Sequence, residues 1–379
     1  MLGSIVHTLS HALADRVKRA LRRATRSESR LRVGVDIRPF YEPLTGIGWY
    51  LYHLLHEIAK REDVELFLFG DARITDIGPA LYADVPASAH VCWFDLRGRA
   101  LIDCDVMFAP NYFLPRLLGA IARRRVITIH DLTYKRFPDL LQKETLHSLE
   151  AHMPREIAAA DAIICVSEST RDDLLQYYQV DPRRVFAIHS GVALPAPGTR
   201  HPALPQRYLL FVSTIEPRKN LGVLLDAFEN LKRKGKYDGS LVVVGRIGWN
   251  SEEFVPRLTG SDVHHLDYLG AAELQTVYRN ADIFVFPSIY EGFGFPLLEA
   301  MAHGVPSIAA RSSSLPEVAG DGALYFDPRD ARELESAITR ILDDPALRDD
   351  LIARGRARVE RFRWETTAER TFEVLQRVS

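Results

Sequence analysis

The chain has 379 residues, 47% of them hydrophobic and 26% charged, with a formal net charge of -2 at pH 7. This length is typical of two domains of about 150–200 residues each, and the near-neutral charge argues against a general nucleic-acid binder. Three widely separated cysteines form neither a disulfide framework nor a CxxC zinc motif, which is typical of a reducing compartment. The sequence has no apolar run of the roughly 18 residues that a membrane-spanning helix needs.

Residues 1–30 combine apolar side chains at helical spacing with a basic bias. Between residues 10 and 30, seven basic residues stand against two acidic ones. A signal peptide would carry its charges before its apolar core, and here the order is reversed. We expect a helix that lies on an anionic membrane surface. A solvated basic arm, a helix docked on the body of the protein and a transit segment are the alternatives.

The rest of the chain alternates between short apolar β-rich runs and helical patterns. In residues 31–193, strands are predicted at 31–37, 64–70, 105–110, 125–130, 162–167 and 185–192. A stretch with four prolines at 194–206 indicates a linker. Residues 207–358 repeat the pattern with strands at 208–214, 240–245, 265–270, 282–288 and 306–310, and residues 359–379 form a last amphipathic helix. We expect two doubly wound α/β domains, with a cleft lined by the carboxyl ends of both parallel sheets.

The stretch EGFGFPLLE, which begins at Glu291, follows an apolar strand and opens a predicted helix. Gly292 and Gly294 permit positive φ angles and close approach of a ligand to the backbone, and Pro296 suits a first helical turn. The free N–H groups of such a helix start favour phosphate. Glu299 falls in the predicted first turn, where its carboxylate can accept both hydroxyls of a ribose or simply complement the helix dipole.

In EPRKN, the cations Arg218 and Lys219 lie where the next helix is predicted to begin. Cations there oppose the helix dipole, which a protein tolerates most readily when an anion lies between them. Arginine can bind a diphosphate in bidentate fashion, and lysine acts as a point charge. The pair indicates a diphosphate site, and a solvated loop is the alternative.

Two stretches of the first domain face the predicted cleft. His130 and Asp131 stand at the carboxyl end of a strand, although a lone histidine there is more often structural than catalytic. In PLTGIGWY, Gly46 and Gly48 join the first strand to its helix. Leu51 stands where a GxGxxG fingerprint has its third glycine, so a dinucleotide site is poorly supported, but a tight turn close to a ligand is compatible with the pattern.

Asp103 and Asp105 have the spacing of an Asp-x-Asp metal motif. Asp105, however, opens an apolar strand, and that end of a strand faces away from the predicted cleft. We therefore do not expect a metal site there.

Several of these stretches resemble a known family. SIYEGFGFPLLEAMAHGVPSIAA resembles the Glu-x7-Glu signature of retaining glycosyltransferase family 4, and STIEPRKNLGVLLDAF resembles the segment of that family that binds the donor diphosphate. HDLTYKRFPD, SEST and TGIGWY resemble the group that contains bacterial O-antigen mannosyltransferases. The similarity runs over residues 31–365. It implies the GT-B fold, in which two Rossmann-like doubly wound domains face a cleft, and a reaction that requires no metal.

The resemblance also implies residue roles. Arg218 and Lys219 would bind the donor diphosphate, Glu291 the hydroxyls of the donor sugar, Glu299 the ribose and His130 the transferred sugar. The other implied donor contacts are Gly292, Phe293, Gly294, Phe295, Pro296 and Leu297 around the sugar and phosphate, Gly245, Arg246, Leu269 and Leu274 around the base, and Gly46, Ile47 and Gly48 against the diphosphate and acceptor. Ser190 departs from the family, which more often has Asn-Gly at this hinge.

The implied function is a retaining hexosyltransferase that moves mannose from GDP-mannose onto a lipid-linked oligosaccharide in O-antigen or surface polysaccharide synthesis. We expect it at the cytoplasmic face of the membrane, with residues 1–30 near a polyprenyl diphosphate acceptor, and without a nucleic-acid partner. The first alternative is the same reaction with UDP-glucose, UDP-N-acetylglucosamine or a GDP-deoxyhexose. A Rossmann-type NAD(P) oxidoreductase and a non-catalytic sugar-nucleotide binder are the more distant alternatives.

Overall fold

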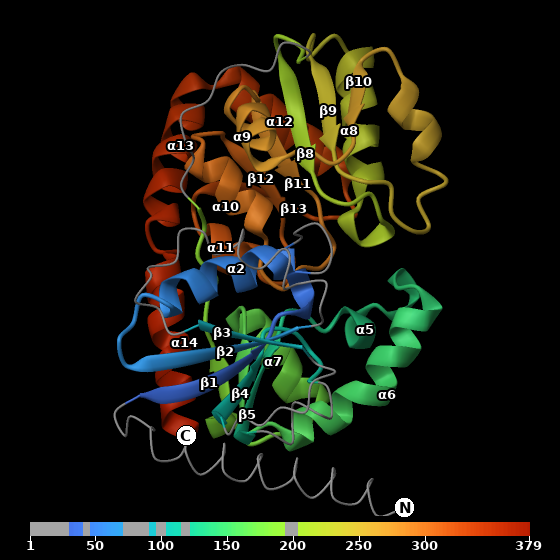
Figure 1. Cartoon of the computed structure of the whole chain (residues 1–379). Helices are drawn as coiled ribbons and strands as arrows, with labels where there is room; N and C mark the ends of the chain where they lie inside the picture. The colour runs from blue at the N-terminus through green and yellow to red at the C-terminus, as the bar shows by residue number, and fades with distance from the viewer. Residues whose placement is uncertain (1–29, 41–45, 71–90, 96–103, 115–121, 194–203) are drawn as a thin grey trace, which may run out of the picture.

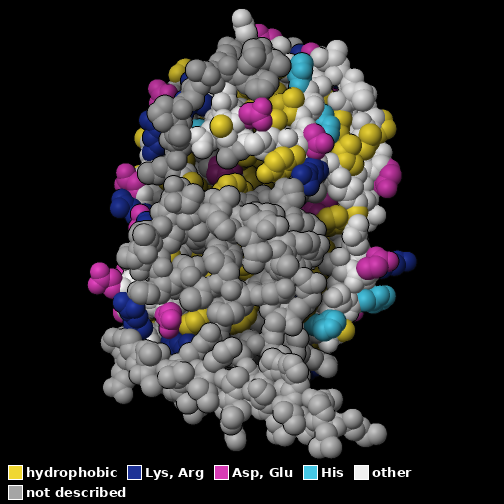
Figure 2. Space-filling model, in the orientation of Figure 1, with side chains coloured by type: hydrophobic (Ala, Val, Ile, Leu, Met, Phe, Trp, Pro, Cys, Tyr) yellow, Lys and Arg dark blue, Asp and Glu magenta, His cyan; other side chains and the backbone are white. Residues whose placement is uncertain are grey.

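Two α/β domains lie one above the other, and the last helix of the chain descends from the second domain along the first (Figure 1). The computed structural model describes residues 30–40, 46–70, 91–95, 104–114, 122–193 and 204–379. The predictions for residues 1–29, for most of the linker and for Asp103 lie outside the described residues. On the face drawn in Figure 2, basic and acidic side chains of the described residues are interspersed.

The first domain contains a parallel sheet whose described strands follow the order β3-β2-β1-β4-β5-β6-β7. Val33 of β1 lies opposite Leu66 of β2 on one side and opposite Val106 of β4 on the other. This reversal of strand order beside β1 is the doubly wound arrangement, which places ligands at the carboxyl ends of the strands. The strands are β1 (Leu31–Asp36), β2 (Val64–Gly70), β3 (Val91–Asp95), β4 (Cys104–Ala109), β5 (Ala122–Ile129), β6 (Ala162–Cys165) and β7 (Val185–Ala187).

The second domain repeats this topology with a parallel sheet in the order β10-β9-β8-β11-β12-β13. Most of its strands are near-continuous apolar runs, because helices cover both faces of such a sheet; all four residues of β11 are buried. The strands are β8 (Tyr208–Val212), β9 (Ser240–Val244), β10 (Val263–Leu266), β11 (Ile283–Phe286), β12 (Ser307–Ala310) and β13 (Ala323–Phe326).

Amphipathic helices connect the strands. In α8, for example, Leu221, Leu224, Phe228 and Leu231 recur at helical spacing and are buried. The α-helices are α2 (Gly46–Ile58), α5 (Thr133–Arg136), α6 (Lys143–Ala159), α7 (Glu168–Tyr177), α8 (Leu221–Arg233), α9 (Ala271–Arg279), α10 (Phe295–Ala302), α11 (Leu315–Ala319), α12 (Ala331–Asp343), α13 (Pro345–Val359) and α14 (Trp364–Val378). Short 3-10 helices are η1 (Arg38–Phe40), η2 (Pro138–Leu140), η3 (Pro182–Arg184), η4 (Pro217–Lys219) and η5 (Val255–Thr259).

Helix α14 returns to the first domain and packs against α2. Its Thr367 donates a hydrogen bond to the carbonyl oxygen of His189, and Arg370 donates one to that of Ala187. Gly191 lies so close to the start of α14 that a Cβ at this position would be 2.4 Å from the backbone nitrogen of Trp364. The segment after β7, from which the chain leaves the first domain, is therefore held by the helix that returns to it.

Some sequence-based element predictions are wrong. Strands β3 and β13, each at an edge of its sheet, were not predicted. The strand expected at 185–192 ends at Ala187. Ile188 still donates to the carbonyl oxygen of Cys165 in β6, but the carbonyl oxygen of His189 accepts from Thr367 of α14, and the N–H of Val192 donates to the carbonyl oxygen of Phe362. The strand expected at 265–270 lies at 263–266, because the backbone N–H of Tyr268 turns to the side chain of Asp267.

Candidate functional site

The loop that carries Arg218 and Lys219 is tied to the loop after β11. Asn220 adopts a left-handed conformation with φ 57°, which asparagine tolerates better than most residues. Its side-chain amide donates to the carbonyl oxygens of Pro287 and Pro328, and the backbone N–H of Ile289 donates to that of Arg218 at 2.9 Å. Contrary to the sequence-based placement, the two cations lie in η4, one residue before α8 begins.

The carboxylate of Glu291 lies between these two cations. Lys219 Nζ lies 2.6 Å from Glu291 Oε1, and Arg218 Nη1 lies 3.0 Å from Glu291 Oε2. Arg218 also pairs with Glu216 at 2.8 Å, a residue that sequence reasoning did not single out. Glu216 and Glu291 are 2% and 8% exposed. Two buried carboxylates thus balance two cations, as buried charges require.

This cluster keeps Glu291 ionised. Burial opposes ionisation of its carboxyl, but the charges of Lys219 and Arg218 outweigh that effect and lower its pKa to about 2. Glu216 behaves in the opposite way, because burial raises its pKa in spite of the same two cations. Glu291 is therefore a weakly basic carboxylate throughout the physiological pH range.

The glycines of EGFGF serve two different purposes. Gly294 has φ 110° and stands just before α10, a conformation that L side chains avoid. Gly292 instead permits contact between the domains, because a Cβ there would lie 1.6 Å from the carbonyl oxygen of His130. The close approach predicted for a ligand is thus made by the first domain at this position. Ser314 secures the loop by donating to the carbonyl oxygens of Glu291 and Phe293.

His130 directly follows β5 and lies beside Gly292, as the sheet topology requires. Its Nε2 lies 2.7 Å from the carbonyl oxygen of Pro110, so this nitrogen carries the proton. The imidazole packs edge-on against Tyr50 and Tyr112, and burial lowers its pKa. His130 is therefore a neutral imidazole held at the junction of the domains.

Glu299 lies elsewhere than predicted. It is the fifth residue of α10, so it stands in the second turn and not the first. Tyr278 of α9 donates a hydrogen bond to its Oε2 at 2.8 Å, and burial raises the pKa of Glu299 in spite of this bond. A charge in the second turn no longer complements the dipole of the helix start. The carboxylate of Glu299 can still accept hydrogen bonds from the hydroxyls of a ribose.

The side chains from Phe293 to Leu297 are packing groups. Phe293 contacts Phe362 at 5.7 Å and His189 at 6.1 Å between ring centroids. Phe295 stacks on Trp364 at 6.1 Å, Pro296 is in the first turn of α10, and Leu297 is fully buried. Because these side chains are apolar, any hydrogen bond from this stretch to a donor must come from its backbone.

The first turn of α2 meets the start of α10. A Cβ at Gly46 would lie 3.8 Å from the ring of Phe295. Gly46, Ile47 and Gly48 belong to this first turn, and not to a loop before it as predicted. These three residues therefore lie close to α10, and their backbone is helical.

The residues expected around the nucleotide base follow the carboxyl ends of β9 and β10. Gly245 has φ 143°, and a Cβ there would lie 1.9 Å from the carbonyl oxygen of Ser213, so glycine is needed for strand packing. Arg246 lies over the ring of Tyr268 at 4.8 Å, and that ring is 49% exposed. Leu269 and Leu274 are partly buried against the core beneath them.

The structure also describes the surroundings of Asp105 and Ser190, which the sequence analysis had singled out. Asp105, of the Asp-x-Asp spacing, accepts a hydrogen bond from the backbone N–H of Arg32 in the neighbouring strand. Ser190, the departure at the hinge, is 1% exposed, and its hydroxyl has no hydrogen-bond partner among the described residues.

Comparisons with known proteins agree with this architecture. Residues 44–194 match the model of Glycosyltransferase Family 4, and residues 200–358 match that of Glycosyl transferases group 1. The O-antigen chain mannosyltransferase B of Escherichia coli is 32% identical over an alignment 375 residues long, and the match covers 89% of this chain and 97% of that protein. The chain belongs to glycosyltransferase family 4. The family resemblance and the fold expected from the sequence are confirmed.

One further relative and one solved structure are similar to this family 4 glycosyltransferase. The MMP alpha-(1->4)-mannosyltransferase of Mycolicibacterium hassiacum is 32% identical over 220 residues, 57% of this chain and 54% of that protein. Sucrose-phosphate synthase from Thermosynechococcus elongatus has the same fold, with a TM-score of 0.70 at 21% identity over 92% of this chain and 99% of that one. The fold is GT-B.

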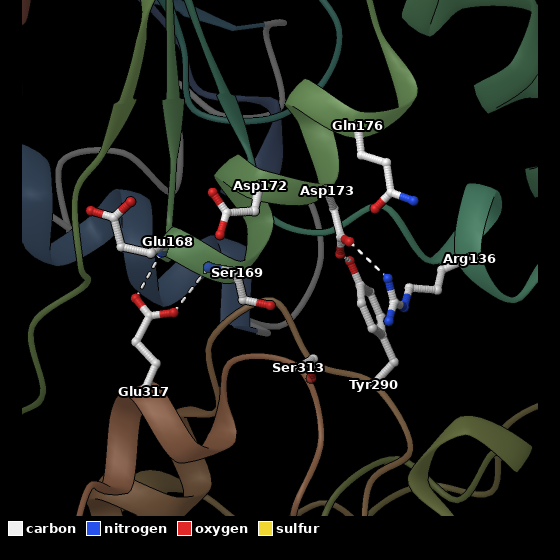
Figure 3. Close-up of a pocket in the computed structure, with 9 residues that line it drawn as sticks. All are labelled: Arg136, Glu168, Ser169, Asp172, Asp173, Gln176, Tyr290, Ser313 and Glu317. Atoms are coloured by element: carbon white, nitrogen blue, oxygen red, sulfur yellow. Dashed lines mark hydrogen bonds and ion pairs between the residues drawn. The ribbon is translucent and has the colours of Figure 1, made fainter. Parts of the chain in front are cut away.

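The glycosyltransferase has a pocket of about 490 Å³ between its domains (Figure 3), and Ser313 in its wall accepts a hydrogen bond from the backbone N–H of Glu291. Tyr290 and Ser313 of the second domain form part of its wall, and Asp173 of α7 faces them. Glu317 accepts hydrogen bonds from the backbone N–H groups of Glu168 and Ser169 at 2.7 and 3.0 Å. Sequence reasoning named none of these side chains as functional, and the proline-led start of α11 was the available signal for Glu317.

Proposed function

We propose that this glycosyltransferase moves mannose from GDP-mannose, with retention of configuration, onto a lipid-linked oligosaccharide in O-antigen or surface polysaccharide synthesis. The observation that carries the proposal is the buried cluster of Arg218, Lys219 and Glu291 beside His130. The choice of mannose is supported by two relatives of about one-third identity that are both named as mannosyltransferases. UDP-glucose, UDP-N-acetylglucosamine and a GDP-deoxyhexose are the alternative donors.

The cluster suits the departure of a nucleoside diphosphate. A guanidinium has five N–H groups and an ammonium three, so both can donate to phosphate oxygens. Cations fixed in a buried site stabilise negative charge that develops on a leaving group, and they need no reorganisation during the reaction. We propose that these two cations do this without a metal. Activity in the presence of a chelator is the corresponding test.

Binding of a diphosphate would also free Glu291 to bind the donor sugar. An anion bound to Lys219 and Arg218 competes with the carboxylate for the same N–H groups, and the released oxygens can accept hydroxyls of the donor sugar. The lowered pKa makes Glu291 a poor nucleophile and a poor base. This favours a front-face displacement, in which the leaving phosphate takes the proton of the acceptor hydroxyl and configuration is retained.

We also propose that residues 1–30, which lie outside the described residues, bring the enzyme to the cytoplasmic membrane face, where a polyprenyl-diphosphate-linked acceptor would be met. Among the described helices, none is both long and apolar enough to cross a bilayer. The basic composition of residues 10–30 supports attraction to anionic lipid headgroups.

The proposal is tested by supplying the enzyme with GDP-mannose and a mannose-terminated lipid-linked oligosaccharide in the presence of EDTA. We expect release of GDP and a new α-linked mannose, the configuration of the donor, in the proton NMR spectrum of the product. Release of UDP from UDP-sugars in preference to GDP from GDP-mannose would overturn the donor. A β-linked product would overturn the proposed mechanism.

A further inference from the structure

The side chain of Tyr290 leaves the second domain and ends inside the first. Its hydroxyl donates a hydrogen bond to Oδ2 of Asp173 at 2.7 Å and accepts one from the backbone N–H of Leu132 at 3.2 Å. The residue is 1% exposed, and its ring lies 5.7 Å from that of Phe137 in the first domain. One domain thus encloses a phenol of the other and uses both its donor and its acceptor capacity.

The first domain holds this socket in place with its own contacts. Asp173 lies on α7, is 6% exposed and pairs with Arg136 of α5 at 3.1 Å. Leu132 lies between β5 and α5, close behind His130. Thr170 of α7 also reaches across the interface, because its hydroxyl donates to the carbonyl oxygen of Gly292 at 3.2 Å.

The backbone of the same segment is fixed by the second domain. The carbonyl oxygen of Tyr290 accepts a hydrogen bond from Arg218 at 2.8 Å, and the backbone N–H of Glu291 donates to Oγ of Ser313 at 2.8 Å. Tyr290 and Glu291 are consecutive, so a displacement of one moves the other. Tyr290 therefore connects the position of the first domain directly to the carboxylate of the cation cluster.

Glu317 makes a separate contact between the domains. Its carboxylate accepts from the start of α7 and pairs with His189, and it lies on the opposite side of the pocket from Tyr290 (Figure 3). This contact bridges the domains, but Glu317 is not a neighbour of Glu291 in the chain. When the Tyr290 contact is removed, the Glu317 contact should still hold the domains together, so that only the position of Glu291 changes.

We infer that Tyr290 is a positioning residue for sugar transfer: its hydroxyl, held by Asp173 and Leu132, sets Glu291 against His130 of the first domain. The inference rests on the proposed function, because it takes Glu291 to bind the transferred sugar. Burial, with the nearby charges of Asp131 and Asp173, raises the pKa of the Tyr290 phenol. The hydroxyl therefore remains a donor over the whole working pH range.

The test compares Tyr290→Phe, which keeps the ring and removes the hydroxyl, with the wild type. A hydrogen bond to a charged group is worth enough that kcat should fall at least about tenfold. Affinity for GDP should be unchanged, because Arg218 and Lys219 belong to the second domain. Asp173→Asn approaches the same contact from the other domain, and the double variant should lose little more than either single one.

A matched control is available in the second domain. The hydroxyl of Tyr237 also bonds to an aspartate, Asp282, at 3.0 Å, and the residue is 3% exposed. Asp282 precedes β11, so this pair lies at the end of the sheet away from the cleft. Tyr237→Phe should therefore leave kcat unchanged, whereas an equal loss in both variants would overturn the positioning role.

Hydrogen–deuterium exchange over residues 130–136 provides a readout that needs no turnover. In Tyr290→Phe, the amide of Leu132 should exchange faster, and the second domain should keep its protection. Unchanged exchange, unchanged kcat, or a parallel loss of kcat and GDP affinity would each overturn the inference. A wild-type protein that binds no nucleoside diphosphate would refute the proposed function instead, while the exchange experiment would still decide the Tyr290 contact.

Discussion

At the scale of residues, the site is defined by the carboxylate of Glu291 and two cations. Lys219 precedes Glu291 by 72 positions in the chain and Arg218 by 73. Lys219 and Arg218 lower the basicity of Glu291, and Asn220 fixes the loop that presents them. The loop that carries Glu291 approaches the first domain through Gly292. Two substitutions test these features separately: one removes the charge of Glu291, and the other disturbs the contact between the domains at Gly292.

Glu291→Gln removes the negative charge with little change in shape. Because a diphosphate then has no competitor for Arg218 and Lys219, GDP should bind as tightly as to the wild type or more tightly. Loss of the carboxylate that holds the sugar should reduce kcat by about 100-fold or more, as is typical when one preorganised charge contact is lost. Steady-state kinetics and calorimetry measure the two quantities, and an equal loss of both would assign Glu291 to nucleotide binding.

Gly292→Ala tests the approach of the two domains. A methyl group would overlap the carbonyl oxygen of His130, so the domains should no longer meet in this geometry. Misplacement by about 1 Å can cost about 100-fold in rate, and GDP affinity should change little. Gly260→Ala is the control, because its φ is -65° and a Cβ there meets only atoms 3.9 Å away. Wild-type turnover of Gly292→Ala would contradict the close contact.

At the scale of elements, α2 and α14 are joined by stacked rings. His53 of α2 stacks on Trp364 of α14 at 5.0 Å and on Trp49 at 5.7 Å. Burial, followed by the like charge of His56, lowers the pKa of His53 to about 4. The helix that returns from the second domain is therefore packed against an imidazole that must stay neutral.

This predicts a specific pH dependence of stability. The pKa of His53 is near 6.5 in an unfolded chain and about 4 in the folded one. The unfolded chain therefore binds more protons between these values, and stability is complete above pH 6.5 and falls as the pH drops through 4. The loss is at most about 3 kcal/mol. Thermal unfolding at pH 7 and pH 4.5 should show a smaller drop for His53→Phe than for the wild type, and equal drops would remove His53 from this role.

The elements themselves were largely predictable. Near-continuous apolar runs separated by helical patterns identify most strands of both sheets, because a parallel sheet buries both of its faces. Such runs did not identify β3 and β13, which both lie at an edge of their sheet. Glu299 was placed one turn too early, because the helix begins at Phe295 and Glu299, its fifth residue, falls in the second turn.

The site was predictable loop by loop but not as an assembly. Carboxyl ends of strands meet at one edge of a sheet, so Arg218, Lys219 and Glu291 were expected near one another. That Glu291 is itself the counter-ion was not, because sequence spacing carries no information on which loops touch. The partners of Tyr290 and Glu317 lie in the other domain, and hydrophobic periodicity does not encode how two domains are oriented.

At the scale of the whole molecule, the domains are joined by the returning helix α14 and by the contacts of Tyr290 and Glu317. Hinge closure is a common way to exclude water from a reacting sugar nucleotide. A bound donor would lie between the halves, whereas the proposed membrane contact belongs to residues 1–30. Membrane association and chemistry should therefore be separable.

Removal of residues 1–30 should release the enzyme from vesicles that contain anionic lipid, because each basic residue near such a surface contributes about 1 kcal/mol of attraction. Hydrolysis of the donor should be unaffected, since the cation cluster lies in the second domain. Co-sedimentation with anionic and with neutral vesicles measures the first effect. Persistent binding of the truncated protein to anionic vesicles would place the membrane contact elsewhere.

The central claim is that the cations beside Glu291 bind the diphosphate of the donor. Its most direct test is calorimetric titration of the wild type and Lys219→Ala with GDP, UDP, ADP and dTDP in the presence of EDTA. We predict that GDP binds most tightly to the wild type and that Lys219→Ala loses at least about tenfold in affinity, as expected for a charge-assisted contact. Equal affinity of the two proteins, or no binding of any diphosphate, would contradict the claim.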